Sequence, residues 1–197
     1  MILFKDIDDH IENEDVLSLA KIWQERAVSC SSGVPKKDSF PIQSLVGILP
    51  HVAIFGLTEK NEVMFKLTGS FIDQLFAKNL SGETLSAISQ GENLEKMAAF
   101  HHEIMTQPCG AYVNTRFVGD NGYLFTYETL TLPLILEDGT PGSMAVLYAE
   151  GIHPSRYEEG QISSALREEP LSTFWIDIGS GTPEGHEQTF TRYVSDQ

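Results

Sequence analysis

Hydrophobic and polar residues alternate over short runs in much of this chain, which is the pattern of β-strands with one buried face. The strongest strand signal lies at 123–151, where two runs rich in β-branched and aromatic residues flank a turn at 137–142. We expect a long hairpin here. The run at 143–149 has almost no polar face, which is typical of a strand covered on both sides. We therefore place this strand centrally in a sheet.

The remaining patterns predict helices on either side of a first strand pair. Before the first strand pair we expect a helix at 16–27 capped by Asp15 and a short helix at 42–48; the strand pair itself lies at 51–57 and 63–68. A short helix from Ser70 and a longer helix from 91 to the residue before Pro108 follow. We then expect a strand at 111–118, the long hairpin, a polar helix at 157–169 and an extra strand at 171–178. Strand runs separated by a helical insert predict an α+β fold, an antiparallel sheet of five strands with helices on one face.

In the first strand of the long hairpin, the apolar residues switch from odd-numbered to even-numbered positions. Its apolar residues have odd numbers from 123 to 127 and mainly even numbers from 130 to 136. Because side chains alternate between faces along a strand, the buried side switches near Glu128 and Thr129. A β-bulge there would explain the switch. We favour cover on both faces, with the aromatic residues under the leading helix and the leucines under the central helices.

Composition narrows the class of partner. The chain has 197 residues, and 13 basic against 28 acidic residues give a formal net charge of −15. This excess argues against nucleic acid and against an anionic membrane surface, since both are bound by Lys and Arg. Cys30 and Cys109 lie in no CxxC motif, so we expect a reducing, cytoplasmic location. We find neither a signal-peptide pattern nor a long apolar run, and so expect no membrane segment.

Motifs of known catalytic or metal chemistry are missing from the sequence, so we expect no enzyme. The glycine-rich nucleotide loops and the GxSxG elbow do not occur. His101 and His102 are adjacent, and neighbouring helical residues point about 100° apart, which argues against a shared metal ion. We therefore expect no metal. Acid–base catalysis by His101 with Glu103 or Glu128 stays open.

Several short motifs resemble one known family. They are Trp23 and Arg26 in the leading helix, Pro35 and Pro41 around the connector, Leu49-Pro50, Thr68-Gly69, Leu80-Ser81-Gly82-Glu83, the run Tyr127-Glu128-Thr129-Leu130-Thr131-Leu132-Pro133-Leu134, and Asp138-Gly139. In this order they resemble the PAS 5 group of bacterial PAS-like domains, found in single-domain alphaproteobacterial proteins, over about 16–151. The chain departs from the pattern at Lys37 and Glu83, where that group usually has Arg.

The resemblance implies a PAS-like five-stranded antiparallel sheet with helices across one face, enclosing a small cavity. We divide the chain into an N-terminal helical extension (1–47), the PAS-like domain (48–152) and a C-terminal extension (153–197). The resemblance implies a sensory or regulatory role in bacterial signal transduction, through a small ligand or a signalling protein partner. It specifies no cofactor.

Candidate ligand-binding residues are apolar side chains of the second and later strands and of the central helices. They are Phe65, Leu67, Phe71, Leu75, Met97, His101, Val113, Phe117, Tyr127, Met144 and Val146. His101, Tyr127 and Arg116 would supply polar groups to a small apolar or amphipathic ligand. The alternative is a dimerisation or adaptor module with a filled core and no ligand. Trp23 and Phe174 are the candidate interface residues of a homodimer.

Overall fold

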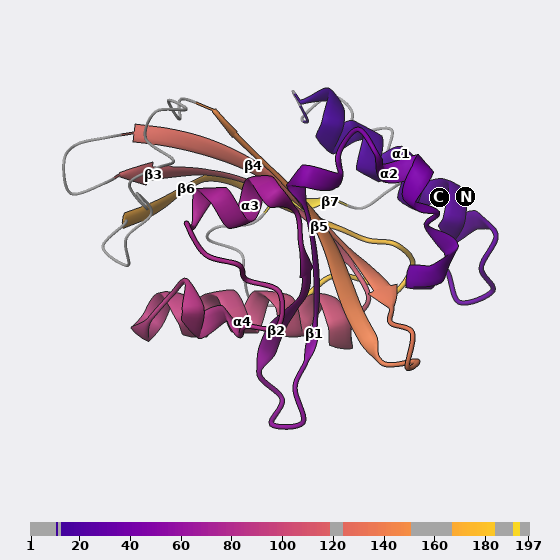
Figure 1. The fold of residues 1–197 in the computed structure, drawn as a ribbon. Coiled ribbons are helices and arrows are strands. Elements are labelled where there is room, and N and C mark those ends of the chain that lie inside the picture. Colours follow the sequence, from indigo (N-terminus) through magenta and orange to yellow (C-terminus); the bar gives the residue numbers. More distant parts are fainter. Residues whose placement is uncertain (1–10, 12, 119–123, 151–166, 184–190, 194–197) are drawn as a thin grey trace.

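One sheet runs through the molecule and organises every other element (Figure 1). The computed structural model describes residues 11, 13–118, 124–150, 167–183 and 191–193. The strand order is β2-β1-β5-β4-β3-β6-β7, antiparallel except for the parallel pair β6–β7. The strands are β1 (Val52–Leu57), β2 (Val63–Thr68), β3 (Gly110–Val118), β4 (Leu124–Ile135), β5 (Pro141–Glu150), β6 (Arg167–Ile176) and β7 (Thr191–Tyr193).

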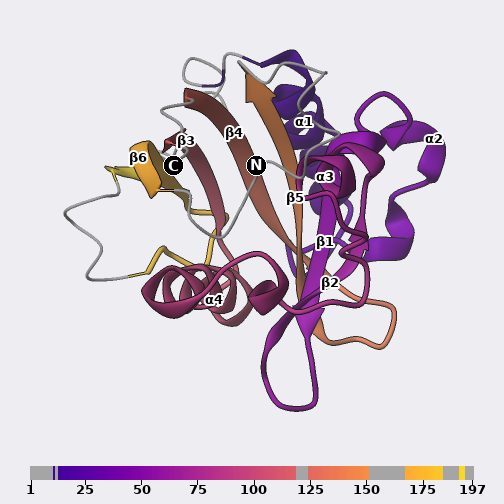
Figure 2. The ribbon, with the colours of Figure 1, turned by 60° about the vertical axis from the view of Figure 1, so that its left-hand side comes forward.

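Helices lie on both sides of this sheet (Figure 2). They are α1 (Glu14–Val28), α2 (Ile42–Leu45), α3 (Ser70–Leu75) and α4 (Gly91–Thr106), with 3₁₀ turns η2 (Lys37–Ser39), η3 (Leu49–His51) and η4 (Leu85–Ala87). The α+β class is confirmed. The expected cap of α1 is wrong by two residues: Asn13 Oδ1 accepts hydrogen bonds from the backbone N–H groups of Asp15 and Val16 at 2.9 and 3.3 Å.

The sheet is longer than expected. The five strands of the prediction are β1 to β5, and β5 lies between β1 and β4 as its apolar run indicated. The extra strand near the C-terminus is confirmed as β6, which pairs with β3, and β7 adds a short parallel strand beyond it. The predicted helix at 157–169 lies outside the described residues up to 166, while 167–169 belong to β6. The sequence Gly119-Asp120-Asn121-Gly122, which is typical of a tight hairpin turn, also lies outside them.

The first face of the sheet, called the α1 face below, is packed against α1. Its core contains Leu130, Leu132 and Leu134 of β4, together with Leu19 and Trp23 of α1. Trp23 is fully buried, and its Nε1 donates a 2.7 Å hydrogen bond to the carbonyl oxygen of Pro133. Such a buried indole combines large apolar contact with a satisfied polar end, so it fixes the position of α1 on the sheet.

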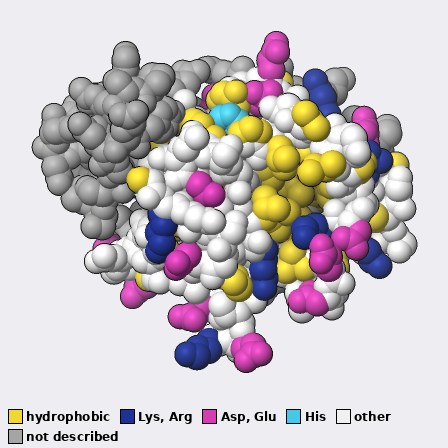
Figure 3. Space-filling model, in the orientation of Figure 1, with side chains coloured by type: hydrophobic (Ala, Val, Ile, Leu, Met, Phe, Trp, Pro, Cys, Tyr) yellow, Lys and Arg dark blue, Asp and Glu magenta, His cyan; other side chains and the backbone are white. Residues whose placement is uncertain are grey.

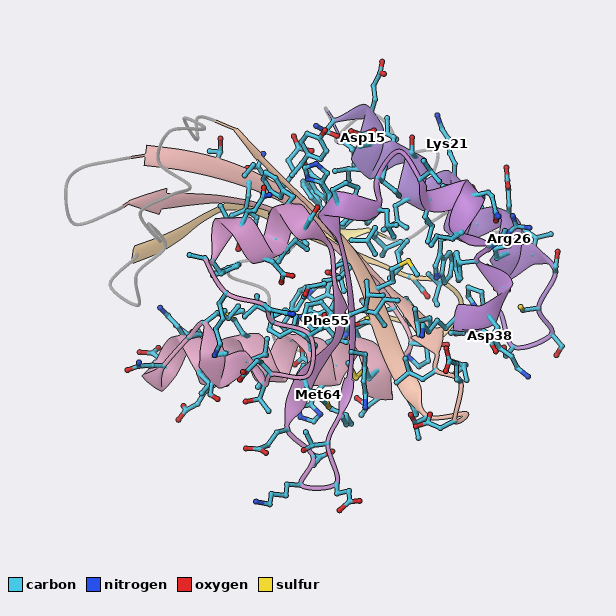
Figure 4. All side chains as sticks on the ribbon, in the orientation of Figure 1. Asp15, Lys21, Arg26, Asp38, Phe55 and Met64 are labelled. Carbon is cyan, nitrogen blue, oxygen red and sulfur yellow. The ribbon has the colours of Figure 1, made fainter. Side chains whose placement is uncertain are left out.

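The second face, called the α4 face below, carries α3 and α4. Phe55 of β1 lies where this strand passes α4 (Figure 4) and packs in one core cluster with Phe65 of β2, Ile72 of α3 and Met105 of α4. Ala145 of β5 belongs to the same cluster. Side chains that are directly opposite on neighbouring strands share a face, so the register of the sheet assigns the remaining positions to one side or the other.

The register of β4 resolves its parity switch. β4 pairs with β3 from Leu124 and with β5 from Thr126, and neither pairing shifts in register. The bulge is therefore wrong and two-sided cover is confirmed. The expected assignment of the faces is reversed: the leucines lie under α1, because they pack with Trp23, and odd-numbered positions such as Thr131 face α4.

The connector between α1 and β1 is held against the β4–β5 turn. The Ile135 N–H donates to the Pro35 carbonyl oxygen at 3.0 Å, and Lys36 forms a parallel bridge with Ile135. Lys37 Nζ lies 2.7 Å from Glu137 Oε1 in an exposed ion pair. Lys37, one of the two departures from the family pattern, thus has a structural partner at this turn.

Candidate functional site

Half-buried apolar side chains converge on the α4 face between α3 and the N-terminal half of α4. Phe71 of α3, Leu94 and Met97 of α4 and Leu147 of β5 all pack on the α4-side core while keeping part of their surface exposed. Leu94 and Met97 are three residues apart and Met97 and His101 are four apart, so they share one side of α4. This part of the face therefore offers apolar contact that the protein's own core does not fully cover.

His101 is the buried polar group closest to this surface. Its ring lies 4.0 Å from that of Phe55 between centroids and meets Phe100 edge-on, and its Nδ1 lies 3.4 Å from Ser143 Oγ. Burial, with a smaller contribution from the nearby His102, lowers the pKa of His101 to about 3. The ring is therefore neutral at physiological pH and presents one donor and one acceptor.

Two threonines of β4 add hydroxyl groups to the α4 face. Thr131 pairs with Ala111 on one side and Ala145 on the other, and Thr129 pairs with Val113 and Leu147. The Oγ1 atoms of both threonines are buried and have no hydrogen-bond partner. Native proteins rarely leave such groups unsatisfied, so the two hydroxyls mark this strand as unusual.

The structure brings some of the predicted ligand-binding residues together and separates others. Phe65, Phe71, Met97 and His101 lie on the α4 face, and register places Val113 and Tyr127 there too. Leu75 is buried on α3. Three predicted residues pack instead in the α1-side core, because the strand register puts them on the same face as the β4 leucines: Leu67, Met144 and Val146. The side chains of Phe117 and Arg116 lie outside the described part.

Sequence analysis missed the polar residues of this face. The sequence pattern does not single out Thr129, Thr131 or Ser143 as site residues, because threonine is common in strands through its β-propensity. The parity switch of β4 was the available signal. Had the leucines been assigned to α1, the odd-numbered threonines would have followed as residues facing the central helices.

The two predicted interface residues occupy different environments. Trp23 is 0% exposed and bonded to Pro133, so in this conformation it contacts the core of its own chain. Phe174 of β6 is half-buried against the α1-side core, with its ring 6.1 Å from that of Tyr112. The exposed large apolar side chains of the described residues lie elsewhere, at Val28, Ile42 and Val46.

Titratable groups near this face do not form a metal site. Among the described residues, no group of three or more His, Cys, Asp or Glu side chains is placed to hold a metal ion. Cys109 is buried at the end of α4, and burial, with the charges of Glu103 and Asp177, raises its pKa to about 12. The thiol therefore stays protonated and unreactive at neutral pH.

No described helix is long and apolar enough to cross a bilayer.

Fold and site together define an α+β domain with a neutral, partly apolar surface between its sheet and its central helices. The family model of the PAS domain matches residues 12–148, which is most of the chain. The chain belongs to the PAS domain family, whose members are sensory and signalling domains. It matches no curated protein.

Proposed function

We propose that this protein is a sensory domain of bacterial signal transduction that binds a small apolar or amphipathic molecule on its α4 face. The observation that carries the proposal is the meeting of half-buried apolar side chains with buried neutral polar groups on one surface. Ligand sites in proteins combine a mainly apolar lining with a few fixed polar groups. The proposed role is non-catalytic and cytoplasmic, with a signalling protein as the receiver.

A chain of contacts supports α1 as the reporter of occupancy. The ring of His51 lies 4.2 Å from Phe71 of α3 and 4.2 Å from Tyr148 of β5, nearly parallel to the latter. His51 Nδ1 lies 3.0 Å from the Leu147 carbonyl oxygen, which can only accept, so Nδ1 carries the proton. Tyr148 is hydrogen-bonded to Asp15 at the start of α1, which raises the Tyr148 pKa. A shift of Phe71 would therefore reach α1 through packed rings.

The direct test is native mass spectrometry of freshly purified protein, compared with Met97→Glu. Met97→Glu places a charge among the apolar side chains of the α4 face, whereas Ala99→Glu puts the same charge on the exposed side of α4. We expect a bound small molecule on the wild type and on Ala99→Glu, and its loss from Met97→Glu. Wild-type protein that carries no additional mass, or a Met97→Glu variant that retains it, would contradict binding at this face.

A second candidate is a dimerisation or adaptor module, and the exposed apolar residues favour it. Ile42 and Val46 of the α2 region are 60% and 64% exposed. Hydrophobic side chains also gather in a yellow area between the β1–β2 hairpin and α2 (Figure 3). Analytical ultracentrifugation of Val46→Glu against Gln43→Glu, an exposed polar position, tests this. Association that Val46→Glu abolishes and Gln43→Glu preserves would favour it; equal behaviour of the two variants would exclude this surface.

A further inference from the structure

The hydroxyl of Thr131 is a buried polar group of the α4 face that has no hydrogen-bond partner. The residue is 1% exposed, its neighbours across the sheet are Ala111 and Ala145, and its Oγ1 has no hydrogen-bond partner. Alanine carries no polar side-chain atom, so the side chains opposite Thr131 on the flanking strands cannot bond its buried hydroxyl. The Oγ1 of Thr129, two residues earlier and on the same face, is in the same condition. A buried hydroxyl without a partner lowers stability, which suits a group that a ligand is to satisfy.

Among the described residues, the sheet positions beside these hydroxyls are uncharged: they are alanine, valine and leucine. The polar groups of this face include the Ser143 hydroxyl, the side chain of Tyr127 and the His101 ring, which burial keeps neutral. Carboxylates act on Cys109 at the C-terminal end of α4, where Glu103 and Asp177 lie. An ion bound at Thr131 would give up its hydration without meeting an opposite charge, which is a large cost. An anion would in addition be repelled by those two carboxylates.

We propose that the α4 face selects an uncharged molecule with an oxygen-bearing head group, such as an alcohol, ketone, ester or amide. Its head group bonds to the hydroxyls of Thr131 and Thr129, and its apolar part lies along Phe71, Met97 and Leu147. Hydroxyls both donate and accept, so each of these head groups finds a partner. This inference rests on the proposed function and adds the chemical class of its ligand.

The test uses three probes with one alkyl chain: 1-octanol, octanoate and octylammonium. Binding of each to the full chain is followed by two-dimensional NMR titration. We expect 1-octanol to bind at least about tenfold more tightly than either ion, a difference of about 1.4 kcal/mol. Octanoate or octylammonium binding as tightly as 1-octanol would overturn the neutral class while leaving ligand binding at the face intact. Binding of none of the three would overturn this inference and count against the proposed function.

Substitutions at the two threonines locate the head group. Thr131→Val keeps the shape and removes the hydroxyl, and Thr131→Ser keeps the hydroxyl. We expect the dissociation constant of 1-octanol to rise about tenfold in Thr131→Val, within the range of a buried hydrogen bond, and to change little in Thr131→Ser. Octylammonium affinity should not respond to either change. Thr129→Val is the second variant, so that a folding defect at one position does not decide the result.

The ligand-free stability of Thr131→Val separates a binding role from a structural one. An unpartnered buried hydroxyl makes no favourable contribution to stability and costs its desolvation, so Thr131→Val should unfold at the same temperature as the wild type or higher. Weaker 1-octanol binding together with equal or raised thermal stability supports the inference. Unchanged binding in both Thr131→Val and Thr129→Val would overturn it, as would a lowered unfolding temperature of Thr131→Val, which would show that its hydroxyl already has a partner.

Discussion

His101 and His102 show how neighbouring residues of one type acquire different properties. His101 faces the sheet and is buried against Phe55, while His102 lies toward the β1–β2 turn, its Nε2 3.0 Å from the Asn61 carbonyl oxygen. The turn of about 100° per helical residue separates the two rings, as the sequence indicated. Burial holds the pKa of the His101 ring far below its ordinary value. A neutral, buried imidazole is a fixed polar group of the α4 face.

We predict that His101 makes the protein lose stability in mild acid. Its pKa is about 3 when folded and about 6.5 when unfolded, so between these values the unfolded chain binds a proton that the folded protein does not. The contribution of the neutral ring is complete above about pH 6.5 and is lost as pH falls toward 3. Urea unfolding at about pH 7 and about pH 5 should show a loss of up to about 2 kcal/mol that His101→Asn lacks.

His102→Gln is the matched control for this experiment, because it removes the neighbouring histidine from the same helix. It should retain the acid-dependent loss, because burial, the larger cause of the lowered His101 pKa, is unchanged in this variant. An identical pH dependence in wild type and His101→Asn would show that the ring of His101 takes up its proton in the folded state near the ordinary pKa.

At the scale of elements, two of the motifs shared with the PAS family, Leu49-Pro50 and Thr68-Gly69, lie in direct contact. Gly69 ends β2, and its backbone N–H donates to the Val52 carbonyl oxygen at 2.8 Å. A Cβ at Gly69 would lie 2.2 Å from the Pro50 carbonyl oxygen and 2.3 Å from that of Leu49. The Leu49-Pro50 turn therefore approaches the backbone of Thr68-Gly69 so closely that only glycine fits. This contact positions α3, which begins at the next residue, against η3.

We predict that Gly69→Ala destabilises the protein by about 2–3 kcal/mol, because two backbone carbonyls must move to admit the methyl group. Gly47→Ala is the matched control: a Cβ there meets no atom within 4 Å, so the change should be neutral or stabilising by up to about 1 kcal/mol. Chemical denaturation of the two variants measures the difference. Equal stability of Gly69→Ala and wild type would show that the Leu49-Pro50 turn is free to shift.

The sequence was most informative where one face of an element had to be buried. Leading-helix spacing placed Trp23 in the core, and the apolar run of β5 placed that strand inside the sheet, because both patterns follow directly from burial. The candidate site was predicted only in part. The switch of apolar residues from odd to even positions shows that β4 is covered on both faces. It does not specify which helix covers which face. That assignment depends on long-range packing, and it decided whether Thr131 or Leu132 faces α4.

At the scale of the molecule, the two faces of the sheet receive different side chains of β4. The β4 leucines pack with Trp23 on the α1 face, whereas Thr129 and Thr131, whose buried hydroxyls have no hydrogen-bond partner, lie on the α4 face. Consistent packing gives stability, and local departures from it tend to occur at functional sites. The two faces meet in β4, whose alternate residues belong to one or the other. The ligand that we propose for the α4 face would therefore contact the same strand that carries α1.

The charge of the whole molecule leads to a last prediction: added salt should stabilise it. The formal net charge is −15, and the excess negative side chains repel one another most strongly in the folded state, where they are closest together. Salt also weakens attractive pairs, but those such as Lys37–Glu137 and Lys78–Glu83 are exposed, and exposed pairs contribute little. Near 0.1 M the screening length is about 10 Å, short enough to suppress repulsion across the surface. The thermal midpoint should thus rise with sodium chloride and rise similarly with potassium chloride; a midpoint that falls with both salts would mean that attractive pairs outweigh the net charge.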